Sequence, residues 1–307
     1  MPVTTPRVAV LLAAYNGMQW IEEQLASILG QSAVHVTVHI SVDESTDGTE
    51  AWCADFAARQ ANVFLLPTGA RFGGASRNFF RLIRDVDVQT YDYVSFADQD
   101  DIWHSDKLQR AIASMRERKV DAWSSNVTAF WEDGRTQLLN KAQPQTRWDF
   151  LFEAAGPGCT YVLTTSLVQA MKQSMLAQWD RLQDVSLHDW YCYAFARSHG
   201  YRWYIDPRPS MDYRQHESNQ VGANTGFSSM ITRYKTIHDG WWFTQVALIS
   251  RLVGQADDPF VGSWLALRRW QLVRLSFSAW RCRRRNRDRA LFFLICWATA
   301  LIGKLAK

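Results

Sequence analysis

Three carboxylates stand within four residues at Asp98, Asp100 and Asp101, directly after the apolar segment 93–97. Carboxylates this close repel one another, so clustering them costs stability unless a cation compensates their charge. Mg²⁺ and Mn²⁺ take oxygen ligands, and such ions commonly bridge one or two carboxylates to the phosphates of a substrate. A solvated turn that caps the next helix is the alternative for such a triplet. Its position after a buried apolar segment favours the metal site.

Two other polar clusters also stand at the ends of apolar segments. The letters YNG at 15–17 end the segment 8–15, and DES at 43–45 follows the segment 36–42. In α/β proteins with a parallel sheet, ligands bind beyond the carboxyl ends of the strands. We therefore expect all three clusters to lie at the ligand-binding edge of one sheet.

The segments that must position these clusters alternate between a strand-like and a helix-like pattern of apolar residues. Apolar runs typical of buried strands are separated by segments whose apolar residues recur at helical spacing. Asp47 and Ser76 are predicted to cap two of the helices. Strands alternating with helices in this way predict an α/β fold, with a mainly parallel sheet and helices on both faces. The expected strands are 8–15, 36–42, 63–66, 93–97 and 122–131, and the expected helices begin near 20, 49, 77 and 105.

The pattern is looser after Pro144. Strands are expected at 159–164 and 201–205, and helices at 167–179 and 187–199. A polar stretch covers 212–226, and the signal from Phe227 onward is helical, with many Arg and Trp residues. We predict a catalytic domain over 1–225, made of a donor half (about 1–130) and an acceptor half (about 131–225), followed by a helical appendage over 226–307.

Composition and charge narrow the class of protein. The 307 residues are 47% apolar and 21% charged, which excludes a disordered or collagen-like chain. Residues 268–307 hold 11 basic side chains and one acid, so the formal net charge of +4 combines an acidic body with a basic tail. Five scattered cysteines without a C-x-x-C pair argue against a disulfide framework or zinc site and fit a reducing compartment. No dinucleotide or P-loop motif occurs.

The motifs together resemble the family 2 glycosyltransferases of GT-A fold, in particular the bacterial rhamnosyltransferase-like branch. The resemblance rests on VLLAAYNG with IEEQLASILGQ, SVDESTDGT, GGASRNF and FADQDDIWHSDKL, then on PGCTYVLT, HDWYCYAFARSHG and YRQHESNQVG. These segments follow in family order between about residues 7 and 222, which is about 70% of the chain. The resemblance implies a GT-A nucleotide-diphospho-sugar transferase fold, to which the helical C-terminal appendage is added.

The resemblance also assigns roles to individual residues. Asp100 is implied as the direct ligand of a divalent metal, with Asp98 nearer the ribose or sugar or in the metal shell. His216 either completes that shell or contacts the diphosphate. Asp43 is implied to read the nucleotide base, although its neighbours Val42 and Glu44 depart from the family's usual Asp and Gly. The implied donor-binding set is Ala14, Tyr15, Asp43, Arg77, Asn78, Asp98, Gln99 and Arg214.

Asp189 takes the place of the family's catalytic carboxylate. At the start of a predicted helix it could deprotonate the acceptor hydroxyl as that hydroxyl attacks the anomeric carbon. A carboxylate favoured by the helix dipole is the alternative reason for an Asp at this position. Asp101, Trp103 and Trp190 are predicted to contact the acceptor or a sugar, with ordinary core packing as the alternative for the two tryptophans.

The basic tail suggests a membrane partner. Six arginines in 281–289 precede the apolar stretch 290–303, which is too short to span a bilayer with confidence. Arginines beside an interfacial apolar helix attract anionic lipids, and Trp270, Trp280 and Trp297 suit a membrane boundary. A solvated arginine face on a helix packed against the body is the alternative. Nucleic acid is a weaker partner, because the apolar stretch favours a membrane.

These observations predict an inverting, metal-dependent glycosyltransferase that uses Mg²⁺ or Mn²⁺. The first candidate donor is dTDP-rhamnose, and the acceptor is a bacterial cell-surface glycan or its polyprenyl-diphosphate-linked precursor. A UDP-hexose or UDP-N-acetylhexosamine transferase of the same fold is the alternative within the class. A non-catalytic membrane-surface scaffold is the alternative from another class. The expected location is cytoplasmic, peripheral on the inner face of the cell membrane through 281–303.

Overall fold

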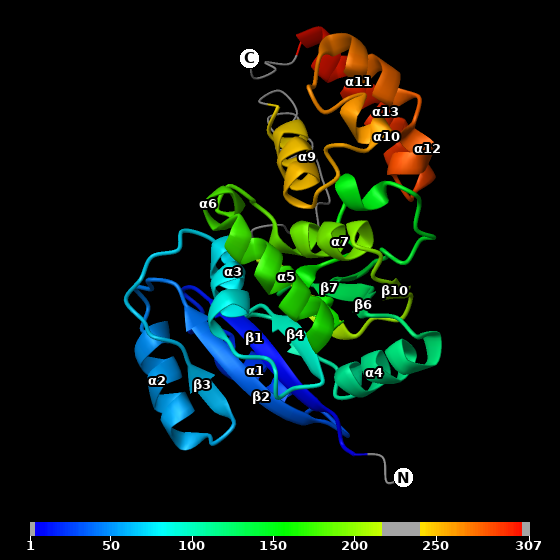
Figure 1. Cartoon of the computed structure of the whole chain (residues 1–307). Coiled ribbons are helices and arrows are strands. Elements are labelled where there is room, and N and C mark those ends of the chain that lie inside the picture. Colours follow the sequence, from blue (N-terminus) through cyan, green and yellow to red (C-terminus); the bar gives the residue numbers. More distant parts are fainter. Residues whose placement is uncertain (1–3, 217–239, 303–307) are drawn as a thin grey trace.

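A computed structural model describes residues 4–216 and 240–302. It shows an α/β body and, beyond helix α7 (His188–Ser198), a separate group of helices formed by the C-terminal part of the chain (Figure 1). The predicted boundary at 225/226, the last residues of the YRQHESNQVG segment and the end of the tail lie outside the described residues.

A seven-stranded sheet forms the centre of the body, in the order β10-β6-β9-β4-β1-β2-β3. All neighbouring pairs are parallel except those that β9 makes with β4 and β6. The mainly parallel sheet predicted from the sequence is therefore present. The strands are β1 (Arg7–Ala14), β2 (His35–Val42), β3 (Val63–Leu65), β4 (Tyr93–Ala97), β6 (Ala122–Ser125), β9 (Val162–Thr164) and β10 (Trp203–Asp206).

Helices cover both faces of this sheet, because successive side chains of a strand point to opposite faces. In β1, Ala9, Leu11 and Ala13 join the core beneath α3, α5 and α7. The alternate residues Val8, Val10, Leu12 and Ala14 join the core beneath α1, α2 and α4. The helices of the body are α1 (Ile21–Leu29), α2 (Thr49–Arg59), α3 (Ala75–Asp85), α4 (Lys107–Arg118), α5 (Thr165–Ala177), α6 (Trp179–Leu182) and α7.

The predicted strand 122–131 is wrong as a single element. It breaks at Asn126, whose backbone N–H donates to the Asp206 carbonyl and whose side chain binds the backbone of Lys141, Ala142 and Pro207. The second half enters a smaller sheet of order β5-β11-β7-β8. Its strands are β5 (Ile102–Trp103), β7 (Val127–Phe130), β8 (Thr136–Leu139) and β11 (Met211–Arg214).

Local predictions at three turns are corrected by the backbone. Glycines, not Asp47 or Ser76, precede the second and third helices: Gly48 has φ 91° and Gly74 φ 147°, both positive values that suit glycine. The expected strand 159–164 begins instead as a 3₁₀ turn, and only its second half is β9. The two such turns in the body are η1 (Asp149–Leu151) and η2 (Gly158–Thr160).

The C-terminal helices pack on the body and extend its larger core. Phe292, Cys296 and Ala300 of the last helix are buried there. No helix within 4–216 or 240–302 is long and apolar enough to cross a membrane. All five cysteines are buried and free. The helices are α9 (Trp241–Leu252), α10 (Pro259–Gly262), α11 (Arg269–Ser276), α12 (Ala279–Cys282) and α13 (Asn286–Ile302).

Candidate active site

The three polar clusters meet at one edge of the large sheet. Ala14, at the end of β1, is in register with Val42 of β2, while Leu12 of β1 is in register with Ala97, the last residue of β4. The Asp43 N–H donates to the Ala14 carbonyl at 2.8 Å. Asp43 directly follows β2 and Asp98 directly follows β4, the two strands that pair with β1. Both residues therefore lie at the edge where a parallel sheet binds ligands.

Strand β11 brings His216 and Arg214 to the acidic cluster. It pairs with β5 directly after Asp101, so the chain leaving β11 lies against Asp100. His216 Nε2 is 2.8 Å from Asp100 Oδ2, and Arg214 Nε donates to the Asp100 carbonyl at 2.9 Å. The His216 ring stacks on Trp20 with 4.1 Å between ring centroids. Two predicted metal ligands from distant parts of the chain are thus in direct contact.

Asp98 and Asp101 face a third group, the thiol of Cys159, with ligand atoms within 4.8 Å of one another. Burial and the charge of Asp100 raise the pKa of Asp98 to about 7. Burial, with the charges of Asp100 and Asp98, raises the pKa of Asp101 well above its usual range. Fully buried Lys107 donates to the Cys159 carbonyl at 2.6 Å and is attracted to both carboxylates. Repulsion and burial together keep protons on this cluster near neutral pH.

Asp189 lies in the first turn of α7, is buried, and interacts electrostatically with Asp98 of the same cluster. Its charge is one of the causes that raise the pKa of Asp98. Burial raises the pKa of Asp189 itself to about 6, and its Oδ1 accepts the Trp190 N–H at 2.7 Å. A close approach of η2 to α7 sets this position: a Cβ on Gly158 would lie 2.6 Å from His188 Nε2 and 3.1 Å from Asp189 Cβ. Glycine is therefore required at 158.

Gln99 holds the loop that follows β1. Its side-chain Oε1 accepts the Tyr15 N–H at 2.7 Å, and its Nε2 donates to the Tyr15 carbonyl at 2.8 Å. A Cβ on Gly17 would lie 2.3 Å from Gln99 Oε1, so only glycine fits beside this amide. The Tyr15 ring remains 56% exposed. Gln99 thus fixes the loop through its own amide, and Tyr15 is the group that projects from it.

Asp43 organises the glycine loop in the same region. Its carboxylate accepts backbone N–H groups of Phe72 at 2.7 Å, Gly73 at 2.9 Å and Gly74 at 3.3 Å. Carboxylates that accept several backbone N–H groups are strongly oriented. Asp43 therefore connects the end of β2 to the turn before α3.

Asn78 and Arg77 differ in what they offer to a ligand. Asn78 is buried, its Nδ2 donates to the carbonyls of Ser41 and Ala14, and its Oδ1 accepts the Ser41 hydroxyl. Both ends of its amide are used inside the protein, so it supports the strand ends from beneath. Arg77 is exposed, and its Nε donates to the Gln183 carbonyl at 3.0 Å.

Three predicted acceptor or sugar contacts are corrected by their burial. Asp101 is 1% exposed, Trp103 3% and Trp190 3%, so none presents a surface to a substrate. Trp103 lies against Lys107, whose Nζ is 3.0 Å from the ring centroid. Trp190 Nε1 donates to the Phe150 carbonyl at 3.1 Å. Core packing, the alternative considered for the two tryptophans, is what the structure shows.

Sequence reasoning missed four residues of the site. Lys107 falls at helical spacing from the apolar Ala111 and Met115, which was a signal that it would be buried. His188 stacks on Phe79 at 3.9 Å, and burial lowers its pKa to about 3, so it is neutral. Trp20 and Gly158 gave no signal, because their partners come from distant segments.

The donor groups fit a hard divalent cation at Asp100. Carboxylate oxygens suit Mg²⁺ and Mn²⁺, and imidazole is accepted by transition metals. Asp100 and His216 already converge, with Asp98 two residues away. The group Asp98, Asp101 and Cys159 fits less well, because burial raises the pKa of the thiol well above its usual range and only a thiolate binds metal strongly.

Comparison with known proteins places the chain in a family. A model described as glycosyl transferase family 2 matches residues 9–173. The chain is 43% identical over 285 residues to the dTDP-rhamnosyl transferase RfbG of Shigella flexneri, covering 92% of this chain and 98% of that protein. The chain belongs to glycosyl transferase family 2. It is a glycosyltransferase that resembles the rhamnosyltransferase branch, as its motifs predicted.

Solved structures of glycosyltransferases share the fold. S. aureus TarS in complex with UDP-GlcNAc matches with a TM-score of 0.53 at 13% identity, over 96% of this chain and 90% of that chain. The mannosyltransferase PcManGT from Pyrobaculum calidifontis, in complex with GDP-Man and Mn²⁺, matches with a TM-score of 0.53 at 18% identity, over 99% and 89%. The GT-A fold predicted for this family 2 glycosyltransferase is confirmed.

Proposed function

We propose that the chain transfers a rhamnosyl group from dTDP-rhamnose to a hydroxyl of a bacterial cell-surface glycan or of its lipid-linked precursor. The observation that carries this proposal is the acidic cluster at the ends of the parallel strands β1, β2 and β4, with the buried carboxylate of Asp189 in electrostatic contact with Asp98. The proposed sugar and nucleotide come from the relative named a dTDP-rhamnosyl transferase, which matches 92% of the chain.

Asp189 is proposed as the general base. A base works best when its pKa lies near the operating pH, and burial has raised that of Asp189 to about 6. As the acceptor oxygen attacks the anomeric carbon, the carboxylate takes the hydroxyl proton, and the bond from that carbon to the diphosphate oxygen breaks. A single displacement of this kind inverts the anomeric configuration.

Asp100 and His216 are proposed to hold a divalent metal, Mg²⁺ or Mn²⁺, with Asp98 beside them. When bound, such an ion supplies charge stabilisation for the leaving diphosphate. One fold neighbour was crystallised with Mn²⁺. Arg214 adds a guanidinium at the same edge, where its Nη2 is 2.5 Å from Glu23 Oε2.

The donor is proposed to lie along the ends of β1 and β2. The exposed ring of Tyr15 and the side chain of Arg77 are the proposed direct contacts, together with the Ala14 end of β1. Gln99, Asn78 and Asp43 are proposed to act by holding the Tyr15 loop, the strand ends and the glycine loop. Preorganised backbone around a ligand lowers the cost of binding.

The acceptor half and the appendage are proposed to work at a membrane. We propose the division into a catalytic domain over 1–225 and an appendage over 226–307, with the enzyme peripheral on the inner face of the cell membrane. An acceptor linked to polyprenyl diphosphate would be presented there. The ten arginines between residues 240 and 302, against three aspartates, support an anionic surface as partner.

A UDP-hexose or UDP-N-acetylhexosamine donor is the second candidate, supported by the fold neighbour solved with UDP-GlcNAc. A non-catalytic scaffold is disfavoured by the acidic cluster, because burying repelling carboxylates costs stability and a scaffold gains nothing in return.

A thermal-shift panel tests the donor directly. The chain is heated with dTDP, UDP or GDP, or with their sugar derivatives, each with and without Mn²⁺. A ligand that binds only the folded state raises the melting temperature. We expect dTDP and dTDP-rhamnose with Mn²⁺ to give the largest rise. A larger rise with UDP-sugars would favour the second candidate, and no rise with any nucleotide would overturn the proposal.

A further inference from the structure

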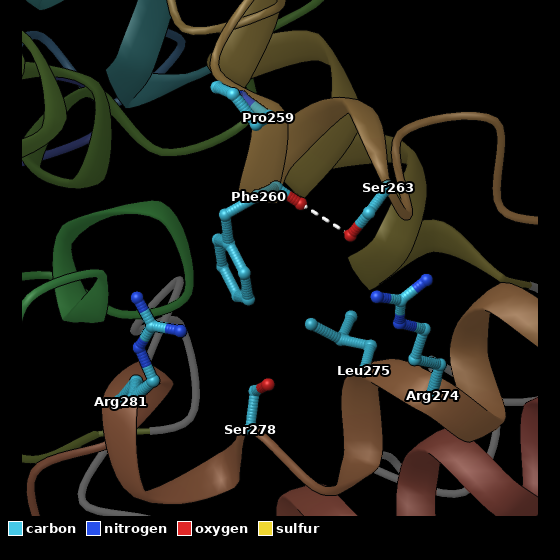
Figure 2. Close-up of a pocket in the computed structure, with 7 residues that line it drawn as sticks. All are labelled: Pro259, Phe260, Ser263, Arg274, Leu275, Ser278 and Arg281. Carbon is cyan, nitrogen blue, oxygen red and sulfur yellow. Dashed lines mark hydrogen bonds between the residues drawn. The ribbon is translucent and has the colours of Figure 1, made fainter.

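A hollow of about 300 Å³ lies among the C-terminal helices, apart from the acidic site. Figure 2 shows Arg274 and Arg281 entering it from opposite sides, with the Phe260 ring between them. The hydroxyl-bearing residues Ser263 and Ser278 complete its polar wall, and Pro259 closes one end. The Ser263 hydroxyl donates to the Phe260 carbonyl at 2.6 Å, so the two guanidinium groups and the Ser278 hydroxyl form the donor set for an anion.

Among the described residues, no carboxylate pairs with Arg274 or Arg281, and the Arg281 guanidinium rests 5.0 Å above the Phe260 ring. Their neighbours in the arginine-rich segment behave differently. Arg284 is fully buried and pairs with Asp149 at 3.2 Å, while Arg283 lies 3.6 Å from Glu153. Arg274 and Arg281 therefore keep their charge available to a partner, as do the exposed Arg268 and Arg269 outside the hollow.

Large apolar side chains are exposed on the helical segments that supply the arginines of the hollow. Trp270 is 57% exposed, Phe277 66% and Trp280 65%. Trp270, Arg274 and Phe277 recur at helical spacing along α11, so the rim aromatics and a hollow arginine share one face. Leu294 of α13 is 62% exposed, and Phe277 contacts Phe293 of the same helix with 5.6 Å between ring centroids. An apolar surface of this kind, next to unpaired cations, marks an interaction site.

We propose that this hollow binds the phosphate group of an anionic membrane lipid, while Trp270, Phe277 and Trp280 enter the headgroup region around it. This inference deepens the membrane association proposed above and rests on that proposal for its partner. The proposed membrane contact is then a defined site between α10, α11 and α12, in place of the whole arginine run 281–289. Tryptophan favours the membrane boundary, because its ring is apolar while its N–H stays hydrated, and guanidinium groups match phosphate oxygens.

A bilayer fits these observations better than a dissolved anion. A free phosphate would use the guanidinium groups and leave the aromatic rim in water. A lipid phosphate brings the glycerol and upper acyl region to the same place, so both parts of the surface are covered at once. The hollow therefore predicts binding that needs lipid charge and bilayer together.

Vesicle co-sedimentation of the full chain tests the site. Vesicles are made of phosphatidylcholine alone or mixed with phosphatidylglycerol. Arg274→Gln/Arg281→Gln removes the hollow cations, and Arg268→Gln/Arg269→Gln is the matched control, because both of its arginines are exposed and neither lines the hollow. Melting temperatures establish that each variant is folded. We expect wild-type binding only to the mixed vesicles, a loss of about thirty-fold in the hollow variant, equivalent to two charges at about 1 kcal/mol each, and a clearly smaller loss in the control.

Other outcomes overturn the inference in distinguishable ways. Equal losses in the two double variants would show diffuse attraction without a site. No binding of wild type to either vesicle would overturn the membrane association as well, while sugar transfer to a water-soluble acceptor would leave the proposed reaction intact. If inorganic phosphate stabilises wild type but not the hollow variant, and both bind vesicles equally, the ligand is a dissolved phosphate and the lipid assignment fails.

Discussion

His216 Nε2 lies 2.8 Å from Asp100 Oδ2, although 116 positions separate the two residues in the chain. The short antiparallel pairing of β11 with β5 produces this contact, because it places the residues after β11 beside those that precede β5. A carboxylate and an imidazole held together at the ligand-binding edge of a parallel sheet form a prepared place for a divalent cation.

The first prediction concerns this pair. Asp100→Asn removes the negative oxygen but keeps the shape, so we expect dTDP to bind at least about tenfold more weakly in the presence of Mn²⁺. Isothermal titration calorimetry measures the affinity. Asp55→Asn is the control, because that carboxylate is exposed on α2, away from the site. Equal affinities in the two variants would contradict a metal role for Asp100.

The second prediction concerns pH. A general base must be deprotonated to accept the hydroxyl proton, and the pKa of Asp189 is about 6. Turnover should therefore rise with pH through about 6 and become level above about pH 7. The rate is measured at saturating donor and metal, so that changes in metal or donor binding do not alter it. A rate that stays flat across this range would argue against Asp189 as the base.

The third prediction concerns the loop held by Gln99. Gly17→Ala places a Cβ against Gln99 Oε1, so the amide must give up its two bonds to the Tyr15 backbone. We expect a destabilisation of about 1–3 kcal/mol and a higher KM for the donor. Gln99→Ala removes the obstacle but loses the same bonds.

The double variant Gly17→Ala/Gln99→Ala provides the check. The effects of substitutions at contacting residues on the free energy of unfolding are not additive. The double variant should therefore lose clearly less stability than the sum of the two single losses. Chemical denaturation of the four proteins measures the coupling. Additive losses would show that the two positions act independently.

The fourth prediction separates the arginines of the C-terminal segment. Arg284 is buried against Asp149 and Glu153, so Arg284→Ala removes a buried cation from both carboxylates and leaves them Arg197 and Arg283 alone. We expect a destabilisation of about 3–5 kcal/mol. Arg287 is exposed and serves as control, and Arg287→Ala should change stability by less than about 1 kcal/mol. Similar effects of the two substitutions on the free energy of unfolding would contradict the structural role of Arg284.

Much of the fold could be predicted from the spacing of apolar residues along the chain. The strand at 8–15 is recognisable because both faces of a central parallel strand are buried and its residues are apolar, while 36–42 and 93–97 are apolar at most positions. The break at Asn126 was not predicted, although the polar residues Ser124, Ser125 and Asn126 interrupt the apolar pattern there. The change is made by side-chain bonds to residues 141, 142 and 207, which are distant in sequence.

The sequence predicted where in the fold the candidate site lies better than it predicted the contacts of individual side chains. Asp100 and His216, which the motifs single out, are in contact, whereas Trp103 and Trp190 are core residues; the roles given to Asp98 and Asp189 stay predictions. An apolar ring near a motif carries no signal of which way it points. The arginine segment showed the same limit, because only tertiary contacts distinguish the buried Arg284 from the open Arg281.

The central claim is tested most directly by transfer of labelled sugar from dTDP-rhamnose to a lipid-linked acceptor, with wild type beside Asp189→Asn. The amide keeps the size of the side chain but cannot accept the proton, so we predict transfer by wild type and a rate lower by about 10²–10⁴-fold in the variant, with dTDP affinity unchanged. Transfer by Asp189→Asn at the wild-type rate would contradict the account.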